Sequence, residues 1–189
     1  MANPEHIPEL DDLDRFTVKL YRSGLGISAL GLVVHAVGAI AGGDHGAWMV
    51  PLGRTLTLAG GALALANVHL YDKRFRWLIP SFGWLGLVVV VAAGQISGRF
   101  GEIALHAGLG FVYVGLSALA LKERFCFRLP GLPWVPLFLA TSLLPMVFGP
   151  PAMAGIILLP AAVIYTLLAV GKSRQPLHFD IGRKDMYQI

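Results

Sequence analysis

The stretch LGLVVHAVGAIAGG, residues 30–43, decides the fold class, because it sets thirteen apolar or small residues around one histidine, His35. The apolar run begins near residue 23, so it is long enough to cross a bilayer as a helix. The composition agrees: 56% of the 189 residues are hydrophobic and 14% are charged, against about 25% charged residues in soluble domains. The sequence therefore predicts an all-α polytopic membrane protein.

Short charged clusters divide the chain into six apolar runs of bilayer length. The runs lie at residues 23–43, 51–70, 79–97, 102–121, 132–149 and 152–170. They predict a transmembrane domain of six helices over residues 23–171, followed by a cytoplasmic tail, residues 172–189. Residues 1–22 form the N-terminal segment. Because Leu10, Leu13, Thr17 and Leu20 share one helical face, residues 5–22 are expected to form an amphipathic helix at the cytoplasmic interface.

The basic residues predict the orientation of these helices. Thirteen of the 15 lysines and arginines fall on one side of the predicted bundle, and only Arg54 and Arg99 fall on the other. The thirteen are Arg15, Lys19, Arg22, Lys73, Arg74, Arg76, Lys122, Arg124, Arg128, Lys172, Arg174, Arg183 and Lys184. Cytoplasmic loops of membrane proteins are enriched in such residues, so both termini are expected in the cytoplasm (N-in/C-in). Topology alone explains the formal charge of +4, and we expect no nucleic-acid binding.

Two stretches fifty residues apart resemble each other. RFRWLIPSFGWLGL (74–87) and RFCFRLPGLPWVPL (124–137) align without gaps and share Arg74/Arg124, Phe75/Phe125, Pro80/Pro130, Trp84/Trp134 and Leu87/Leu137. Each follows one predicted span and begins the next, with the proline starting the new helix. Duplication of a helical hairpin and shared interfacial constraint both explain the match.

A stripe of small residues on the first span includes His35. Steps of three and four residues connect Gly24, Ser28, Gly31, His35, Gly38 and Gly42. Small residues let membrane helices approach closely, so we expect His35 to face protein rather than lipid. Similar stripes run from Gly53 to Tyr71 and from Glu102 to Ala120. The simplest arrangement packs the first, second and fourth spans through these stripes.

His35 and His106 are the residues that most suggest chemistry. At 1.5 Å per residue, they lie about 12 Å and about 6 Å below the outer membrane edge. Two histidines on separate membrane helices suit a b-type haem, and with Glu102 they suit a metal ion. A histidine and a glutamate in an apolar pocket also suit a quinone or a proton path. In the alternative interpretation, the histidines only hydrogen-bond across helices and fix packing.

The other polar residues are assigned by their depth. Arg54 is expected near the outer surface, where it can pair with Glu102, and Asn67 and His69 are expected near the inner edge. Tyr113 is an interior polar residue. Contacts with lipid or a partner at the inner face are expected from Arg74, Lys122, Arg124, Trp84 and Trp134.

The stretches NVHLYDKRFRW (67–77) and LALKERFCFRLPG (119–131) resemble a bacterial family of integral membrane proteins, domain of unknown function 2301. The features that carry the resemblance are Lys122, Glu123, Phe125, Cys126 and Phe127 after the fourth span, and the pair His69 and Tyr71. The resemblance covers most of residues 23–170. It implies a six-span protein in a bacterial inner membrane and no particular activity.

The sequence contains no Walker loop, HExxH, GxSxG, CxxC or dinucleotide fingerprint. We therefore expect a non-enzymatic accessory or assembly component of a larger membrane complex, contacting other subunits through its small-residue stripes. One alternative is a membrane redox protein that binds haem, a metal or a quinone through His35 and His106. The other is a carrier of a small solute or ion.

Overall fold

The structure is a computed structural model that describes residues 9–127, 129–182 and 184–187. All regular elements in these residues are helices, and they contain no strand. The elements are α1 (Asp12–Ala41), α2 (Gly43–Ala66), α3 (Lys73–Ala93), α4 (Arg99–Cys126), the 3-10 turn η1 (Leu132–Trp134), α5 (Val135–Phe148), α6 (Pro151–Ser173), α7 (His178–Ile181) and the 3-10 turn η2 (Lys184–Met186). Arg128 and Arg183, which the topology prediction used, lie outside the described residues.

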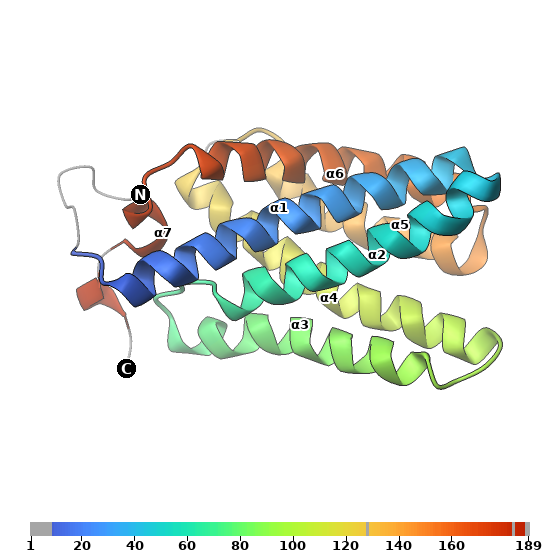
Figure 1. The fold of residues 1–189 in the computed structure, drawn as a ribbon, viewed down its shortest axis with the longest axis horizontal. Coiled ribbons are helices and arrows are strands. Elements are labelled where there is room, and N and C mark those ends of the chain that lie inside the picture. Colours follow the sequence, from blue (N-terminus) through green and yellow to red (C-terminus); the bar gives the residue numbers. More distant parts are fainter. Residues whose placement is uncertain (1–8, 128, 183, 188–189) are drawn as a thin grey trace.

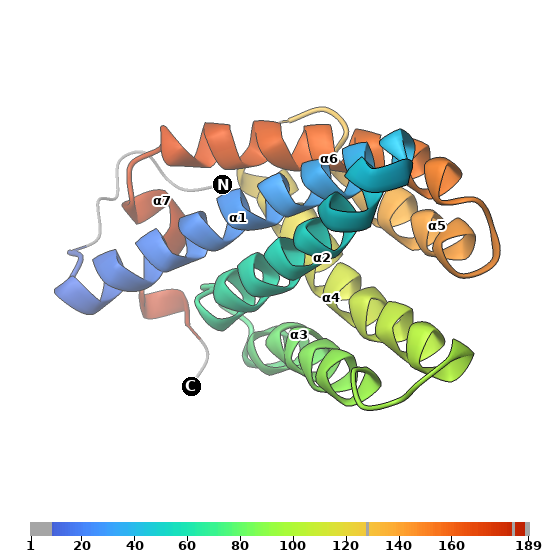
Figure 2. The same cartoon turned by 45° about the vertical axis from the view of Figure 1, so that its right-hand side comes forward.

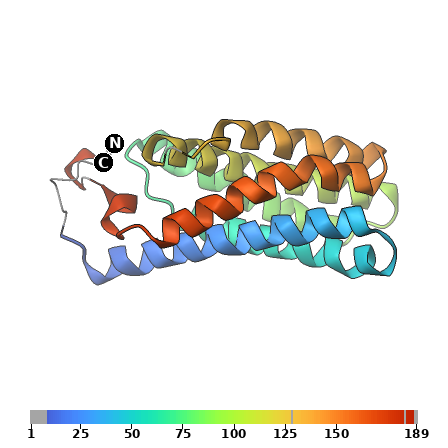
Figure 3. The same cartoon turned by 90° about the horizontal axis from the view of Figure 1, so that it is seen from above.

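The six long helices run alternately in opposite directions along one bundle (Figure 1). The N-terminal part of α1 and the segment after α6 therefore lie at the same end, which we call the terminal end. The α1–α2, α3–α4 and α5–α6 connections lie at the other, which we call the far end (Figure 3). Helix α1 packs on α2 and α6, whereas α4 packs mainly on α3 and α5 (Figure 2).

Five of these helices, α1, α2, α3, α4 and α6, are long and apolar enough to cross a membrane. Helix α5 has only 14 residues, which corresponds to about 21 Å at 1.5 Å per residue. A bilayer core is about 30 Å thick. With the 3-10 turn η1 directly before it, α5 belongs to one apolar helical stretch, Leu132–Phe148. This stretch nearly matches the expected fifth span, residues 132–149, but it is shorter than the five candidate spans.

Helix α1 begins eleven residues before the expected start of the first span. Asp11 and Asp14 form a capping box, in which Asp14 N–H donates to Asp11 Oδ1 at 2.7 Å and Asp11 N–H donates to Asp14 Oδ2 at 3.2 Å. This cap satisfies free N–H groups of the first turn. Residues 12–22 are thus the first turns of the 30-residue α1 rather than a separate interfacial helix. In this part Val18 and Tyr21 are buried, whereas Leu13 is exposed.

Helix α2 also begins earlier than expected, at Gly43 instead of residue 51. Gly42 and Gly43 have φ angles of +61° and +53°, which glycine adopts readily. They form a tight turn that lets α2 start directly after α1. Pro51, which was expected to start this span, therefore lies inside the helix.

The small-residue stripes of α1 and α2 face each other. A Cβ atom at Gly31 would lie 2.4 Å from Thr57 N, and one at Gly60 would lie 2.4 Å from Ser28 N. These backbones touch because the glycines have no side chains. The stripes of α1 and α2 therefore pack against each other within the chain, as the sequence predicted. They are covered by this packing, so they are not available for the expected contacts with other subunits.

Helix α4 does not join α1 and α2 in the expected way. Its close approach is to α3, where a Cβ atom at Gly86 would lie 2.6 Å from Gly108 O. Glycine thus sets the α3–α4 crossing as well, but with residues outside the predicted stripe of α4. The stripe residue Gly110 has only Leu143 of α5 near its Cβ position.

The two similar stretches do not form equivalent structures. Asp72 caps α3 by accepting from Arg74 N–H at 2.7 Å, so α3 begins at Lys73 and Pro80 lies inside it. In the second copy, Pro130 lies in the connection before η1, and Trp134 ends η1. The shared residues therefore occupy different elements, and the idea of a repeated helical hairpin receives no support from them.

Candidate functional site

A cavity of about 340 Å³ opens at the far end of the bundle. Its polar lining residues are those singled out from the sequence: His35 from α1, Arg54 from α2, and Glu102 and His106 from α4. Small and apolar side chains complete the lining: Ala39, Val50, Leu105, Met146, Pro151 and Ala154. The fold therefore brings together four polar residues that lie up to 71 positions apart in the sequence.

Arg54 lies deeper than expected. Because α2 begins at Gly43, Arg54 is eleven residues into the helix, about 16 Å from its start. The neighbouring Gly53 packs directly on the backbone of His35, since its Cβ position lies 2.3 Å from His35 N. Arg54 is thus at the depth of His35, not at the surface.

Arg54 and Glu102 do not form the expected ion pair. The guanidinium is half-buried and the carboxylate is exposed, and no ion pair within 4.0 Å joins them or links either one to another described residue. Both groups line the cavity, and Glu102 is close enough to act electrostatically on Arg54. A charge at this depth without an ion partner is costly in a membrane protein, so such residues usually mark functional sites.

The two histidines are held differently. His35 is 2% exposed, and its Nδ1 atom has no hydrogen-bond partner among the described residues. His106 Nδ1 is 2.7 Å from the backbone oxygen of Glu102. Since a carbonyl only accepts, His106 Nδ1 donates, and Nε2 is left to meet the cavity or a ligand. The histidines therefore do not bond each other across the helices; each keeps one nitrogen uncommitted.

The cavity has no ready set of metal ligands. Within the described residues, no group of three or more His, Cys, Asp or Glu side chains is placed to hold a metal ion. His106 is turned toward its own helix, and Glu102 is exposed. The arrangement is better suited to hydrogen bonds and ionic contacts with an organic ligand than to coordination by His35, His106 and Glu102.

Other predicted polar residues lie away from the cavity lining. Asn67 donates to Leu63 O at 2.8 Å, which caps the end of α2, and His69 Nε2 is 3.0 Å from Thr17 Oγ1 of α1. Both lie at the terminal end, as expected. Tyr113 is buried in the interior and its hydroxyl has no described partner, but it is not among the lining residues.

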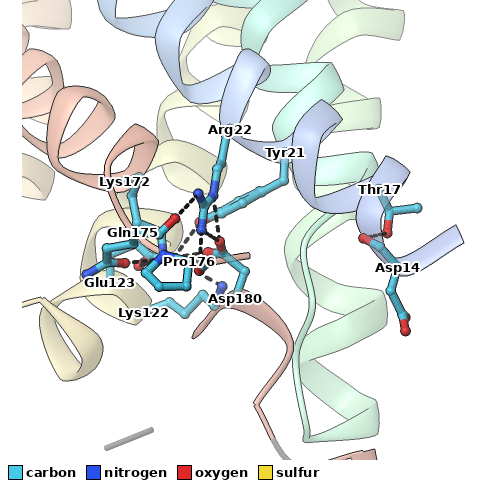
Figure 4. Close-up of polar contacts among 10 residues, drawn as sticks. All are labelled: Asp14, Thr17, Tyr21, Arg22, Lys122, Glu123, Lys172, Gln175, Pro176 and Asp180. Atoms are coloured by element: carbon cyan, nitrogen blue, oxygen red, sulfur yellow. Dashed lines mark hydrogen bonds and ion pairs between the residues drawn. The ribbon is translucent and has the colours of Figure 1, made fainter. Parts of the chain in front are cut away.

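A second polar region, which sequence reasoning missed, lies at the terminal end (Figure 4). We call it the terminal-end cluster and define it by Tyr21, Arg22, Lys122, Glu123, Lys172 and Asp180. Glu123 accepts from the Tyr21 hydroxyl at 2.6 Å and pairs with Lys172 at 2.9 Å and Lys122 at 3.1 Å. Lys172 also pairs with Asp180. The cluster thus joins α1, α4, α6 and α7.

Arg22 binds the segment after α6. Its Nε and Nη2 atoms donate to Asp180 Oδ2 at 2.7 and 2.5 Å, and Nη1 donates to Gln175 O at 2.6 Å (Figure 4). Further along, Lys184 pairs with Asp14, which raises the pKa of the Lys184 ammonium. Burial raises the pKa of the Tyr187 hydroxyl, which donates to Ile181 O at 2.9 Å. The tail is therefore docked on its own bundle.

The residues expected to contact lipid or a partner at the inner face do not all lie there. Arg74, Arg124 and Trp134 are exposed and remain free for such contacts. Trp84 is also exposed, but it is eleven residues into α3, about 16 Å from the start of the helix, so it lies at mid-helix rather than at the inner face. Lys122 instead belongs to the terminal-end cluster, where its ammonium lies 4.7 Å from the centre of the Tyr21 ring. The available signal for this cluster was Glu123, a lone carboxylate among basic residues at the end of an apolar helix.

Comparison with known proteins places the chain among membrane proteins. Residues 63–189 match the family model described as "Uncharacterized integral membrane protein (DUF2301)". An "Uncharacterized protein" of Haemophilus influenzae is 32% identical over 189 residues, covering the whole of both chains. No solved structure matches this chain. The matched range contains Glu102, His106 and the tail, but not His35 or Arg54.

Proposed function

Since the chain belongs to the family of uncharacterised integral membrane proteins DUF2301, we propose that it is a non-enzymatic membrane protein that binds a small ligand in the far-end cavity. Arg54 is the observation that carries this proposal. Its half-buried guanidinium lines the cavity without an ion partner among the described residues. A ligand with an anionic or hydrogen-bond-accepting group satisfies it.

The proposal includes the topology. In it, all six long helices cross the inner membrane of a bacterium, with the terminal end in the cytoplasm and the cavity facing the opposite side. Residues 1–22 and 172–189 are then cytoplasmic flanks of the transmembrane domain, residues 23–171. The alternating helix directions, which gather the basic segments at one end (Figure 1), support this orientation.

The same cavity would serve the redox alternative. His35 and His106 both line it, and each has a nitrogen that bonds no described residue. The lack of a three-ligand group in the described residues favours a quinone head group over a metal ion within that alternative.

The carrier alternative is less favoured, because buried leucines, among them Leu32, Leu109, Leu116 and Leu158, fill the interior between the two ends.

A role in a larger complex is the second candidate, and helix α3 favours it. Only 11% of its apolar window is buried within the chain, compared with 33% or more for the other long apolar helices. Its exposed side chains include Trp77 and Trp84. A partner helix packing on α3 would bury this face, whereas the stripes of α1 and α2 are already occupied.

Native mass spectrometry of the protein in nanodiscs made directly from cell membranes tests the ligand proposal. We expect a small-molecule adduct on the wild type that is absent from the Arg54→Gln variant. Arg99→Gln serves as the matched control, since Arg99 is an exposed arginine at the same end and does not line the cavity. Identical adducts on wild type and Arg54→Gln, or no adduct on either, would contradict the proposal.

A further inference from the structure

We propose that the ligand of the far-end cavity is a zwitterion, with an anionic group that binds Arg54 and an ammonium group that binds Glu102. This inference rests on the proposed function and names the class of ligand. Two charges of opposite sign line the same cavity without pairing with each other. A cavity lined by two separated opposite charges is the complement of a molecule that carries both.

The depths of the two charges give the ligand a direction. Arg54 lies beside the level of His35, because Gly53 contacts the His35 backbone. Glu102 lies in the first turn of α4 and is exposed, so it is at the mouth of the cavity. The anionic end therefore enters first, and the ammonium group stays near the aqueous surface, where an ammonium is strongly hydrated.

The remaining lining completes the fit. The imidazoles of His35 and His106 border the cavity and offer hydrogen bonds without adding a fixed charge. Val50, Leu105 and Met146 supply apolar surface for the carbon atoms between the two charged groups. A volume of about 340 Å³ is at the lower end of the range for ligand sites, roughly 300–1,000 Å³, which suits one small molecule or one lipid head group.

Two sources supply this chemistry. A free amino acid carries a carboxylate and an ammonium group. A phosphatidylethanolamine head group carries a phosphate and an ammonium group, and its acyl chains would leave the cavity toward the bilayer. Both present the same pair of charges to Arg54 and Glu102, so the experiment has one arm for each.

In the first arm, the detergent-purified protein is titrated calorimetrically with glycine, β-alanine and 4-aminobutanoate, and with acetate and ethylamine as singly charged controls. We expect at least one zwitterion to bind ten times more tightly than either control, because both charges are then paired. Glu102→Gln should weaken the zwitterion about tenfold and leave acetate unchanged, whereas Arg54→Gln should abolish both. Arg99→Gln should bind as the wild type does.

In the second arm, the protein is placed in nanodiscs of phosphatidylglycerol alone or with phosphatidylethanolamine, and retained lipid is counted by native mass spectrometry. A lipid source predicts selective retention of phosphatidylethanolamine that Glu102→Gln removes. The zwitterion proposal would be overturned if acetate bound as tightly as every zwitterion and Glu102→Gln had no effect in either arm. The cavity would then be a site for an anion that depends on Arg54 alone. Binding that ignores Arg54 as well would overturn the ligand site itself.

Discussion

Glu123 shows how one residue holds several helices together. It is fully buried at the end of α4, and it contacts Tyr21 of α1, Lys172 of α6 and the neighbouring Lys122. Charges buried in this way are stable only while their partners and hydrogen bonds are in place. Removing one carboxylate therefore leaves Lys172 with Asp180 as its sole acidic partner in the cluster.

We predict that Glu123→Gln lowers the free energy of unfolding by about 3–5 kcal/mol, the cost of breaking a buried ion pair from one side. The measurement is a denaturant titration of the purified protein in mixed micelles, followed by circular dichroism. Glu9→Gln is the control, because Glu9 is exposed, and a surface change of this kind usually stays within about 0.5 kcal/mol. Equal stabilities for the two variants would show that the cluster does not hold the bundle.

At the scale of elements, the contact between α1 and α2 depends on the absence of side chains at particular positions. Gly24, Gly31, Gly53 and Gly60 each have a backbone atom of the partner helix within 2.4 Å of the position a Cβ atom would take. The same contact sets the depth of Arg54 beside His35. Packing of these two helices and the geometry of the cavity are therefore linked.

Two glycines of α1 make a matched pair for testing this contact. A Cβ atom at Gly31 would meet Thr57 N at 2.4 Å, whereas nothing lies within 4 Å of the corresponding position at Gly26. We predict that Gly31→Ala destabilises the protein by about 1–3 kcal/mol through overpacking. Gly26→Ala should stabilise it by about 0.5–1 kcal/mol, because alanine favours the helix. Thermal unfolding in detergent measures both; a shift of the same sign for the two variants would argue against direct contact.

For the whole molecule, the sequence predicted the helical class, the grouping of basic segments at one end, and the position of His35, Glu102 and His106 toward the opposite end. It could do so because apolar runs and flanking charges are local signals. It misplaced Arg54, because the Gly42–Gly43 turn, which lets α2 begin at Gly43 instead of residue 51, was not recognised. It also missed the docking of Asp180 on Arg22, since a contact between residues 158 positions apart leaves no local pattern in the sequence.

The same view of the whole molecule gives its two ends different roles. The terminal end is closed by buried ion pairs and the docked tail, which join α1, α4, α6 and α7. The far end keeps an open cavity lined by Arg54, which has no ion partner in the part of the chain that the structure describes. If the terminal end lies in the cytoplasm, ligand reaches the cavity only from the opposite side of the membrane.

Cysteine accessibility in spheroplasts tests this two-ended account most directly. In a chain with Cys126→Ser, one variant carries Leu105→Cys in the cavity lining and the other carries Lys19→Cys on the exposed side of α1 near the terminal end. We predict that a membrane-impermeant thiol reagent added outside labels Leu105→Cys at once and labels Lys19→Cys only after the membrane is permeabilised. Labelling of Lys19→Cys from outside, or no labelling of Leu105→Cys before permeabilisation, would contradict it.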